Sequence, residues 1–574
     1  MAGDAGAQLR LAQLYERGQG VVQSFIDAVH WFRLAADQGS VPAQARLGEI
    51  YLTGLEAPAL ATASAIARVE GPAFQSTMLG RLFPDGFSIK QDMEQARIWN
   101  LRAAEGQDAA AQARLGYQYA AGLGATQDPA VAEQWFLVAA QKDHVAGQLG
   151  LGMLYAGAYG KFREPSLAIE WLEKATGHGN ATAKLCLAIL LLYGEDVPLD
   201  RNRARSLLEE AAAAGQPAAM YHLGEIYRRG EGVEVDASRA ESWLRRAVAR
   251  GHVKASLSMA WLFDSGPERD ANSAALYCRQ AAELGEPDAQ FFLGQCYLAG
   301  KGVPVDPVEA ARWMSKAAEQ GITAACERLG AMYAEGLGLP QDFNAAGDWF
   351  HRAAANGDVH ALYHLGTLRT GGMGTPCDPR SARELYRRAA KQGSGAACLR
   401  LGMIYATGEH VKADYTAAAH WYAQAAVCGV AEGFYNLAFL HFRGLGVSQD
   451  TDRALHLLER AVDGGSVEAA WALYHQFNDG TYTARDEAVA ATWLYRAAEL
   501  GNAAAACRLA DLHERGDPRA PPADRVSGLL EQCATQGDAV AQARLAVWYL
   551  EGRGADKDLT KASRWFERAA RGGN

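Results

Sequence analysis

The chain has 574 residues, a net charge of −10 and 49% hydrophobic residues. The negative charge argues against a generally basic surface for nucleic acid, so we predict no nucleic-acid partner. No stretch reaches the roughly 18 uninterrupted apolar residues of a membrane-spanning helix, so we predict no membrane insertion. A globular chain of this length would be expected to divide into about three or four domains, unless it is built from repeats whose core grows lengthwise.

A recurring signal starts near the amino terminus and continues to the end of the chain. It is centred on a leucine, or in one copy a methionine, that returns after 36 residues in most steps and after 32 or 34 in the other two. The sixteen anchors are Leu11, Leu47, Leu79, Leu115, Leu151, Leu187, Leu223, Met259, Leu293, Leu329, Leu365, Leu401, Leu437, Leu473, Leu509 and Leu545. A period of this length is typical of helical-hairpin solenoids, so we predict an all-α fold of about 16 hairpins.

The copy around Leu329 shows how the first helix of each hairpin is specified. Ala325, Leu329 and Met332 fall on one apolar stripe of a helix. Gly330, one position after the anchor (+1), has no side chain and lets the second helix approach closely. Gly336 at +7 suits the left-handed conformation that ends a helix.

The second helix has its own signals. Asp342 at +13 is the right residue type to cap its amino terminus. Trp349 at +20, with Ala353 and Ala354, is predicted to form its buried face, and Gly357 to end it.

Two copies depart clearly from the repeat. The one near 44–72 lacks the tryptophan and is four residues short, and the one near 255–285 has a shortened interhelical loop. No Ser- or Gly-rich linker interrupts the chain, so we predict a single continuous solenoid over residues 1–574. Both ends stop at a repeat boundary without a polar capping unit, so we expect the chain to be a segment of a longer protein.

The full pattern is A-x-x-x-L-G-x-x-Y-x-x-G-x-G-V-x-x-D-x-x-x-A-x-x-W-[FL]-x-x-A-A-x-x-G, well matched by segments 219–251 and 289–321. It resembles the Sel-one-like repeat (SLR) family of the tetratricopeptide-type α-solenoids, over nearly the whole chain. The resemblance implies a right-handed superhelix of antiparallel α-hairpins. It also implies a bacterial scaffold or adaptor rather than an enzyme, because members of that family are mostly non-enzymatic.

Motifs that could carry chemistry have simpler explanations. The recurrent Gly-x-Gly pairs join helix to helix, so we interpret them as tight turns and not as nucleotide loops. His360 and His364 have a spacing that can chelate zinc, but no third ligand accompanies them. We therefore predict no catalytic residue, no metal and no cofactor.

Nine cysteines occupy different repeat positions and form no C-x-x-C motif. We expect them to be unpaired apolar residues. Together with the absence of a signal sequence this favours a cytoplasmic compartment, and a periplasmic one stays open if the amino terminus has been trimmed.

Arginine precedes the anchor in seven repeats: Arg10, Arg46, Arg114, Arg328, Arg400, Arg508 and Arg544. Stacked repeats would align these side chains in a ladder. Two interpretations remain open, ion pairs within each repeat and an anionic site facing a partner.

The strongest functional signal lies opposite the buried stripe of the first helix, at positions −2 and +2. Side chains four residues apart are neighbours on a helix, and an exposed face should be polar there. Instead many are aromatic or apolar, and this predicts a partner-binding face. The residues proposed for it, including two polar neighbours, are Tyr221, Trp261, Phe291, Tyr363, His364, Met403, Tyr435, Asn436, Phe439 and Trp471.

The alternative is that neighbouring first helices cover these side chains. If they are accessible, the sequence favours a non-enzymatic scaffold that binds a peptide or a partner protein along its concave groove. A second hypothesis is a glycan-handling or cell-envelope assembly module, in which rings stack on sugars. The oligomeric state is not indicated by the sequence.

Overall fold

The computed structural model describes residues 3–21, 23–55, 89–160, 163–194, 196–266, 269–374, 376–554 and 556–572. Within these ranges the regular structure is helical, and one isolated antiparallel bridge joins Leu55 and Ile89. The prediction of an all-α hairpin repeat is confirmed. Most of the irregular repeat near 44–72 lies outside the described residues. The described part ends at residue 55 and lies mostly in α3 (Val41–Thr53).

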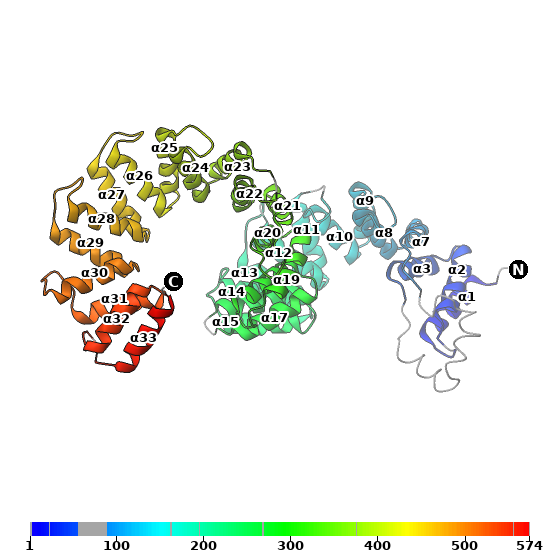
Figure 1. The fold of residues 1–574 in the computed structure, drawn as a ribbon. Helices are drawn as coiled ribbons and strands as arrows, with labels where there is room; N and C mark the ends of the chain where they lie inside the picture. The colour runs from blue at the N-terminus through cyan, green and yellow to red at the C-terminus, as the bar shows by residue number, and fades with distance from the viewer. Residues whose placement is uncertain are drawn as a thin grey trace. The chain divides into compact units, whose positions relative to one another are not determined.

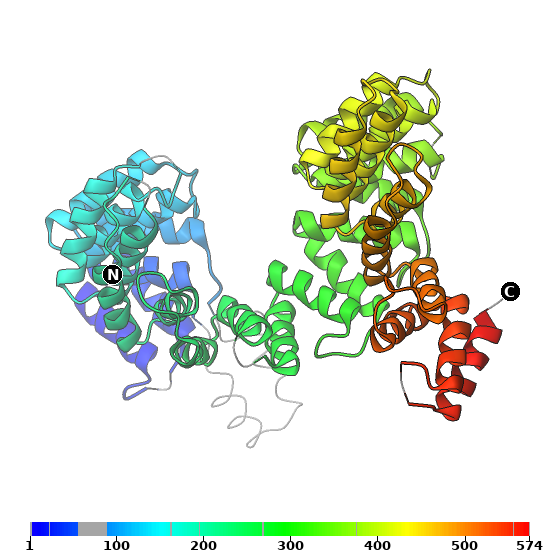
Figure 2. The same ribbon diagram turned by 90° about the vertical axis from the view of Figure 1, so that its left-hand side faces the viewer.

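The chain divides into two compact units, Met1–Glu286 and Pro287–Asn574. The single continuous solenoid therefore stays a prediction. Figures 1 and 2 show that each unit is built from helices. Unit 1 contains α1 (Ala5–Arg17), α2 (Phe25–Asp37), α3 (Val41–Thr53), α7 (Met93–Glu105), α8 (Ala109–Ala121), α9 (Pro129–Gln141), α10 (Val145–Tyr155), α11 (Pro165–Gly177), α12 (Ala181–Tyr193), α13 (Arg201–Ala213), α14 (Pro217–Arg229), α15 (Ala237–Val248), α16 (Val253–Ser265) and α17 (Ala271–Glu283).

Unit 2 is a stack of helix pairs that follows a curved path in Figure 1, from the green α19 to the red α33. Its helices are α18 (Pro287–Ala299), α19 (Pro307–Glu319), α20 (Thr323–Glu335), α21 (Phe343–Ala355), α22 (Val359–Gly371), α23 (Pro379–Lys391), α24 (Gly395–Thr407), α25 (Tyr415–Val427), α26 (Ala431–Arg443), α27 (Thr451–Asp463), α28 (Val467–Asp479), α29 (Glu487–Glu499), α30 (Ala503–Glu514), α31 (Ala523–Thr535), α32 (Ala539–Glu551) and α33 (Leu559–Gly572). In this unit the even-numbered helices are the first helices of their hairpins.

The caps of the hairpin α20–α21 agree with the sequence prediction. Gly336 ends α20 with a φ of 70°, in the left-handed region that a glycine adopts without steric cost. Asp342 Oδ1 accepts hydrogen bonds from the backbone N–H groups of Asn344 (2.9 Å) and Ala345 (3.1 Å), so it satisfies donors that the helix leaves free. Both helix ends are therefore fixed by residues of the repeat itself.

The predicted role of Trp349 needs correction. The residue that fills the space between the helices is Phe350 at +21, whose side chain is 1% exposed, whereas Trp349 is only half-buried. A Cβ atom on Gly330 would lie 2.8 Å from Phe350 Cδ1, so the +1 glycine makes room for the +21 ring. Trp349 lies beside that contact, and the guanidinium of Arg352 lies over its ring, 4.5 Å from the ring centroid.

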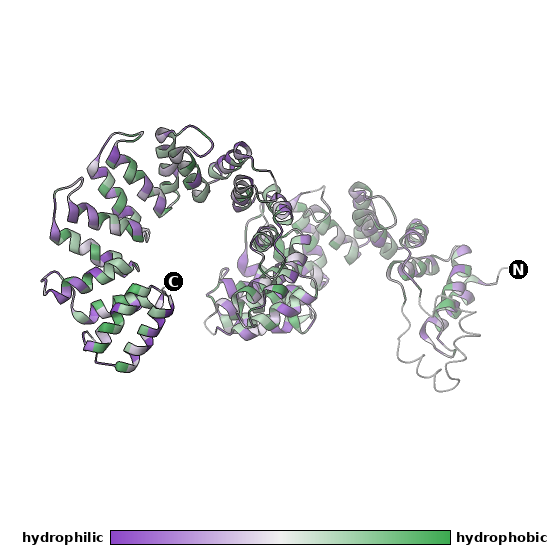
Figure 3. Cartoon of the chain, viewed as in Figure 1, coloured by the Kyte–Doolittle hydropathy of each residue, from purple (hydrophilic) through white to green (hydrophobic). Residues whose placement is uncertain are grey.

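The same arrangement recurs in both units. Cβ atoms on Gly116 and Gly366 would lie 2.6 Å from the rings of Phe136 and Tyr386, which occupy the +21 positions of their own repeats. The hydropathy colouring of Figure 3 shows hydrophobic and hydrophilic residues interleaved along these amphipathic helices.

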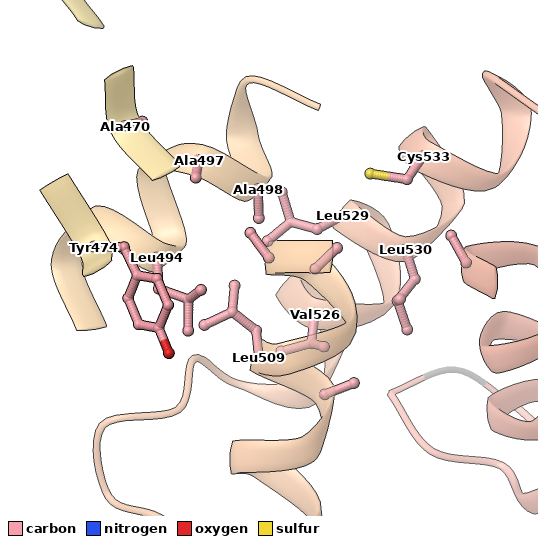
Figure 4. Packing of buried hydrophobic residues seen from close by; sticks show 14 of the residues in the cluster. Ala470, Tyr474, Leu494, Ala497, Ala498, Leu509, Val526, Leu529, Leu530 and Cys533 are labelled. Carbon is pink, nitrogen blue, oxygen red and sulfur yellow. The ribbon is translucent and has the colours of Figure 1, made fainter. Parts of the chain in front are cut away.

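Successive hairpins share one core. Figure 4 shows Leu494 of α29, Leu509 of α30 and Leu530 of α31 in the space that these helices enclose. A buried glutamine at −3 adds a directional contact, because Gln112 Nε2 donates to the carbonyl oxygen of Ala104 in the preceding second helix (3.0 Å). Each repeat thus buries its apolar side against the next.

In the repeat near 255–285, α16 ends at Ser265 and α17 begins at Ala271. None of the nine cysteines, all of which lie in described segments, forms a disulfide. Five of them are buried and act as small apolar residues of the core: Cys278, Cys296, Cys326, Cys398 and Cys533.

Candidate functional site

All ten residues of the predicted binding face lie on first helices. We call the −2 and +2 positions of these helices the first-helix face. Unit 1 contributes two of the ten residues and unit 2 the other eight. Eight are half-buried, and two are exposed, Met403 at 39% and Phe439 at 45%. Neighbouring helices therefore cover this face in part and leave the remainder open.

In unit 1 the face is built around a buried carboxylate, Glu225 of α14, which is 3% exposed. Arg228 donates to both of its oxygens, at 2.9 and 2.8 Å, and Arg229 Nε lies 2.8 Å from Oε2. Burial alone would raise the pKa of Glu225, but the contacts with Arg228, Ser258 and Arg229 together outweigh it and leave the pKa lowered. The carboxylate is therefore ionised at neutral pH and holds two cations on the face.

Rings surround this charged group. Tyr221 stacks on His252 of the next repeat, with ring centroids 4.6 Å apart, and lies 5.1 Å from His222. Burial, with a smaller contribution from the neighbouring His252, lowers the pKa of His222 to about 4. Trp261 lies on α16 with the guanidinium of Arg228 5.6 Å from its ring centroid. Tyr221 and Trp261 are thus brought together around one ion pair, as neighbours of Arg228 and Glu225.

In unit 2 the −2 residues of six successive first helices, α18 to α28, are Phe291, Glu327, Tyr363, Leu399, Tyr435 and Trp471. Five of the six are apolar or aromatic, and all six are half-buried. Phe291, Tyr363, Tyr435 and Trp471 each pack one side against a core cluster. Their rings are held by the scaffold while part of each stays at the surface.

His364 is engaged within the scaffold. Its ring stacks on Phe350, with centroids 4.8 Å apart, and Nε2 lies 3.3 Å from Glu327 Oε1 on α20. The hydrogen bond from His364 lowers the pKa of Glu327. One ring nitrogen of His364 therefore already joins neighbouring repeats, so its predicted role as a polar contact for a peptide would rest on the other nitrogen.

The most open part of the face lies on α24 and α26. Met403 and Phe439 are both +2 residues of neighbouring first helices, and both are exposed. The guanidinium of Arg443 lies 4.3 Å from the ring centroid of Phe439. Asn436, one position before the anchor Leu437, is half-buried on the same helix. This region combines an apolar surface, a cation and an amide.

Trp471 closes the row on α28. It stacks on Tyr474 at 5.1 Å and meets His475 edge-on at 4.9 Å. His475 Nδ1 in turn lies 2.9 Å from Asp479 Oδ2. Tyr474, which replaces the usual small residue at +1, is 4% exposed, so the scaffold accommodates its ring in the core.

The −2 position is not open in every copy, because Leu257, at −2 in the shortened repeat, is 3% exposed. Sequence reasoning also passed over Glu225, His222 and His252, because a lone polar residue on a helix is usually solvated. The signal that could have identified Glu225 is an acid at +2, followed by two arginines in a single helical turn.

The arginine ladder makes specific ion pairs, which are not confined to single repeats. Arg46 Nε donates to Glu16 Oε1 (2.8 Å), and Arg544 pairs with Glu514 (2.7 Å); both acids belong to the preceding repeat. Arg400 pairs with Glu409 of its own repeat at 3.1 Å. These arginines join repeats to each other as well as stabilising single ones.

Within the described ranges no group of three His, Cys, Asp or Glu side chains could hold a metal ion. None of the helices described has both the length and the apolar composition needed to cross a membrane. His360 and His364 do not acquire a third ligand among these residues.

A sequence model of the family described as Sel1 repeat matches sixteen segments of the chain. They are residues 5–40, 41–61, 77–108, 109–144, 145–180, 179–216, 217–252, 253–286, 287–322, 323–358, 359–394, 395–429, 431–466, 470–502, 503–529 and 539–574. Among curated proteins, none matches this chain.

Solved structures resemble the chain as well. One is a protective antigen of uropathogenic Escherichia coli strains that displays an SLR fold. It is 30% identical, with 70% of this chain and 86% of that chain covered and a TM-score of 0.50. Another is a Sel1 repeat protein from Oxalobacter formigenes, 28% identical, with 64% of this chain and 95% of that chain covered and a TM-score of 0.44.

Proposed function

Because this chain belongs to the Sel1 repeat family, whose solenoids generally mediate protein–protein interaction, we propose that it is a non-enzymatic scaffold that binds a peptide or partner protein along its first-helix face. The partner lies against the aromatic row of unit 2, centred on α22 to α26. The solenoid holds the first-helix face rigid, and the side chains of that face recognise the partner.

One observation carries this proposal: beside the row of half-buried rings lie two exposed apolar side chains, Met403 on α24 and Phe439 on α26. A ring that is fixed on one side loses little conformational freedom when a partner covers the other side. Contiguous exposed apolar surface on a polar protein usually marks an interaction site. A peptide or helix that covers this row removes apolar surface from water at low entropic cost.

The charges beside the rings favour a peptide over a sugar. A sugar stacks on the open face of an aromatic ring, whereas the guanidinium groups of Arg228 and Arg443 lie over Trp261 and Phe439. A guanidinium next to an apolar surface instead suits a polypeptide, which brings carbonyl or carboxylate oxygens together with apolar side chains. The glycan hypothesis therefore has less support from this face.

The test uses the full chain and defined peptides. Peptides selected from a random phage-displayed library on the immobilised protein are synthesised with a fluorescent label, and their affinity is measured by fluorescence polarisation. Tyr363→Ala and Phe439→Ala are each expected to weaken binding roughly tenfold or more, because buried aromatic anchors carry most of an interface's energy.

Phe566→Ala is the matched control, because Phe566 is a similarly exposed phenylalanine (40%) on the terminal second helix α33. It is expected to leave affinity unchanged. Equal binding by the wild type, Tyr363→Ala and Phe439→Ala would refute the proposed face. Selection of no peptide, with binding of soluble oligosaccharides to the same protein, would favour the glycan hypothesis.

A further inference from the structure

A cavity of about 300 Å³ opens between the carboxyl-terminal ends of α10 and α12 in unit 1. Its walls are mainly apolar and include Met153, Ile189, Leu190 and Val197. The volume is at the small end of the range of roughly 300–1,000 Å³ typical of ligand pockets. It can admit one bulky side chain and is too small for a large cofactor.

The cavity exists because two neighbouring repeats depart from the common pattern. Helix α10 has 11 residues and ends at Tyr155, whereas α12 has 13 residues and extends further. Gly194, which follows α12, has an extended φ of −66° and ψ of 125° in place of the usual left-handed cap. The chain after each helix therefore leaves in an unusual direction, and none of the described residues fills the space between the two helix ends.

The rim of the cavity has one cation and one anion, Arg163 and Asp196. A neutral rim with both signs suits a polypeptide backbone, which offers N–H donors and carbonyl acceptors in equal number. It suits an anionic amphiphile less well, because Asp196 would repel the head group.

The cavity is continuous with the first-helix face of its own unit. Met153 and Ile189 are the +2 residues of their repeats. Tyr193 also lines the cavity, and its ring centroid lies 6.4 Å from that of His222, which in turn contacts Tyr221. The Tyr193 hydroxyl lies 3.1 Å from Glu231, which fixes this wall of the cavity.

We propose that this cavity is an anchor pocket that takes one bulky aliphatic or aromatic side chain of a bound peptide, whose flanking backbone passes along Tyr193 toward Tyr221. This inference rests on the proposed peptide-binding function and adds to it a second contact site, in unit 1. The ligand is an extended peptide with a single apolar residue that is essential for binding.

The experiment fills the pocket and leaves the rest of the face intact. Ile189→Trp places a larger side chain in the cavity. Its effect is measured by fluorescence polarisation on the full chain with labelled peptides selected on the Tyr363→Ala chain, in which the aromatic row of unit 2 is impaired. Binding is expected to weaken about tenfold or more, and replacing the one shared apolar residue of the peptide with alanine should weaken it about as much. Leu276→Trp is the matched control, because Leu276 is 56% exposed on α17 of the same unit. It should not change the affinity.

The outcomes separate this inference from the proposed function. Full affinity of these peptides for folded Ile189→Trp would overturn the anchor pocket. If peptides selected on the wild type lose affinity in Tyr363→Ala, the scaffold proposal still stands. A different result would also overturn the anchor pocket: octanoate binds the wild type but not Ile189→Trp, and no peptide is sensitive to that substitution. The cavity would then be assigned to a small amphiphile. Circular dichroism of Ile189→Trp checks folding, and Met153→Ala, which enlarges the cavity, should weaken peptide binding by a smaller factor in a folded protein.

Discussion

The first-helix faces of the two units use the same helix positions with different chemistry. In unit 1 the face around α14 and α16 holds a buried acid, Glu225, with Arg228 and Arg229 and with rings packed around the charges. In unit 2 the face from α18 to α28 is mainly aromatic and apolar, and it is open at Met403 and Phe439. A repeat can therefore change the character of its face without changing its fold.

The reason lies in the deep positions, which are equivalent in both units. Gly116 faces Phe136 in unit 1 as Gly330 faces Phe350 in unit 2, and a Cβ atom on either glycine would meet the facing ring at a closely similar distance. These contacts set the approach of the two helices in each hairpin. The −2 and +2 side chains are not needed for the contact between the glycine and the ring, although some pack on the same ring, as Tyr117 does on Phe136 at 4.9 Å. Their residue types can therefore differ between repeats that keep the contact.

The largest effect is expected at this shared contact. Phe136→Ala and Phe350→Ala should each cost about 3–5 kcal/mol, because both remove a fully buried ring and leave a cavity. The half-buried tryptophans beside them should cost less, about 1–2 kcal/mol for Trp349→Ala. Hydrogen exchange across each hairpin measures the loss of protection. A cost for Trp349→Ala equal to that of Phe350→Ala would contradict the assignment of the core position.

The second-largest effect on stability should differ between the two units. Glu225→Ala is expected to cost about 2–3 kcal/mol, because it leaves the half-buried Arg228 without its bidentate partner. Glu327→Ala, which breaks the more exposed contact with His364, should cost under about 1 kcal/mol. Protection of α14 and α20 against hydrogen exchange gives both values. Adding Arg228→Met to Glu225→Ala should restore part of the stability, since it removes the unpaired charge.

The third effect is a pH dependence of unit 1. His222 has a pKa of about 4 in the folded chain and an ordinary value of 6.5, because burial and the nearby His252 disfavour its charged form. The unfolded chain therefore takes up a proton as the pH falls through 6.5, while the folded chain does so only near 4. The stability that unit 1 gains from keeping His222 neutral is fully present above pH 6.5 and declines progressively as the pH falls toward 4.

Burial and the charge of Lys254 lower the pKa of His252 as well. The charge of Glu225 raises the pKa of His222 and so partly opposes its shift. The measurement is hydrogen-exchange protection of α14 at pH 7 and pH 5, corrected for intrinsic exchange rates. His222→Phe should reduce the difference between the two conditions. An unchanged pH dependence in that variant would mean that other groups cause it.

The smallest effect on stability is expected at Phe439, the exposed ring beside the aromatic row. Phe439→Ser should cost only about 0.5–1 kcal/mol, because the ring is 45% exposed and loses chiefly its contact with Arg443. Thermal unfolding of the full chain measures this cost, and peptide binding should fall in the same variant. A cost comparable to that of Phe350→Ala would show that Phe439 serves the core.

The sequence by itself determined the repeat, because its signals are local. The period of the anchors, the glycine at +7 and the aspartate at +13 act within one or two turns of a helix, so their meaning does not depend on distant residues. The prediction that the −2 and +2 residues lie on the first helices follows from the same helical period. All ten residues proposed from it are half-buried or exposed, and their contact with a partner stays a prediction.

Only the tertiary structure decided how neighbouring positions divide between core and surface. Helical spacing places Trp349 and Phe350 about 100° apart, and the close approach over Gly330 selects Phe350 for the core. Packing between repeats likewise buried Leu257, paired Arg46 with Glu16, and enclosed Glu225 among arginines and rings. The cavity beside Ile189 depends on where two chain segments leave their helices, which no period in the sequence specifies. These features arise from contacts between helices, and such contacts depend on the distance and angle at which neighbouring helices pack.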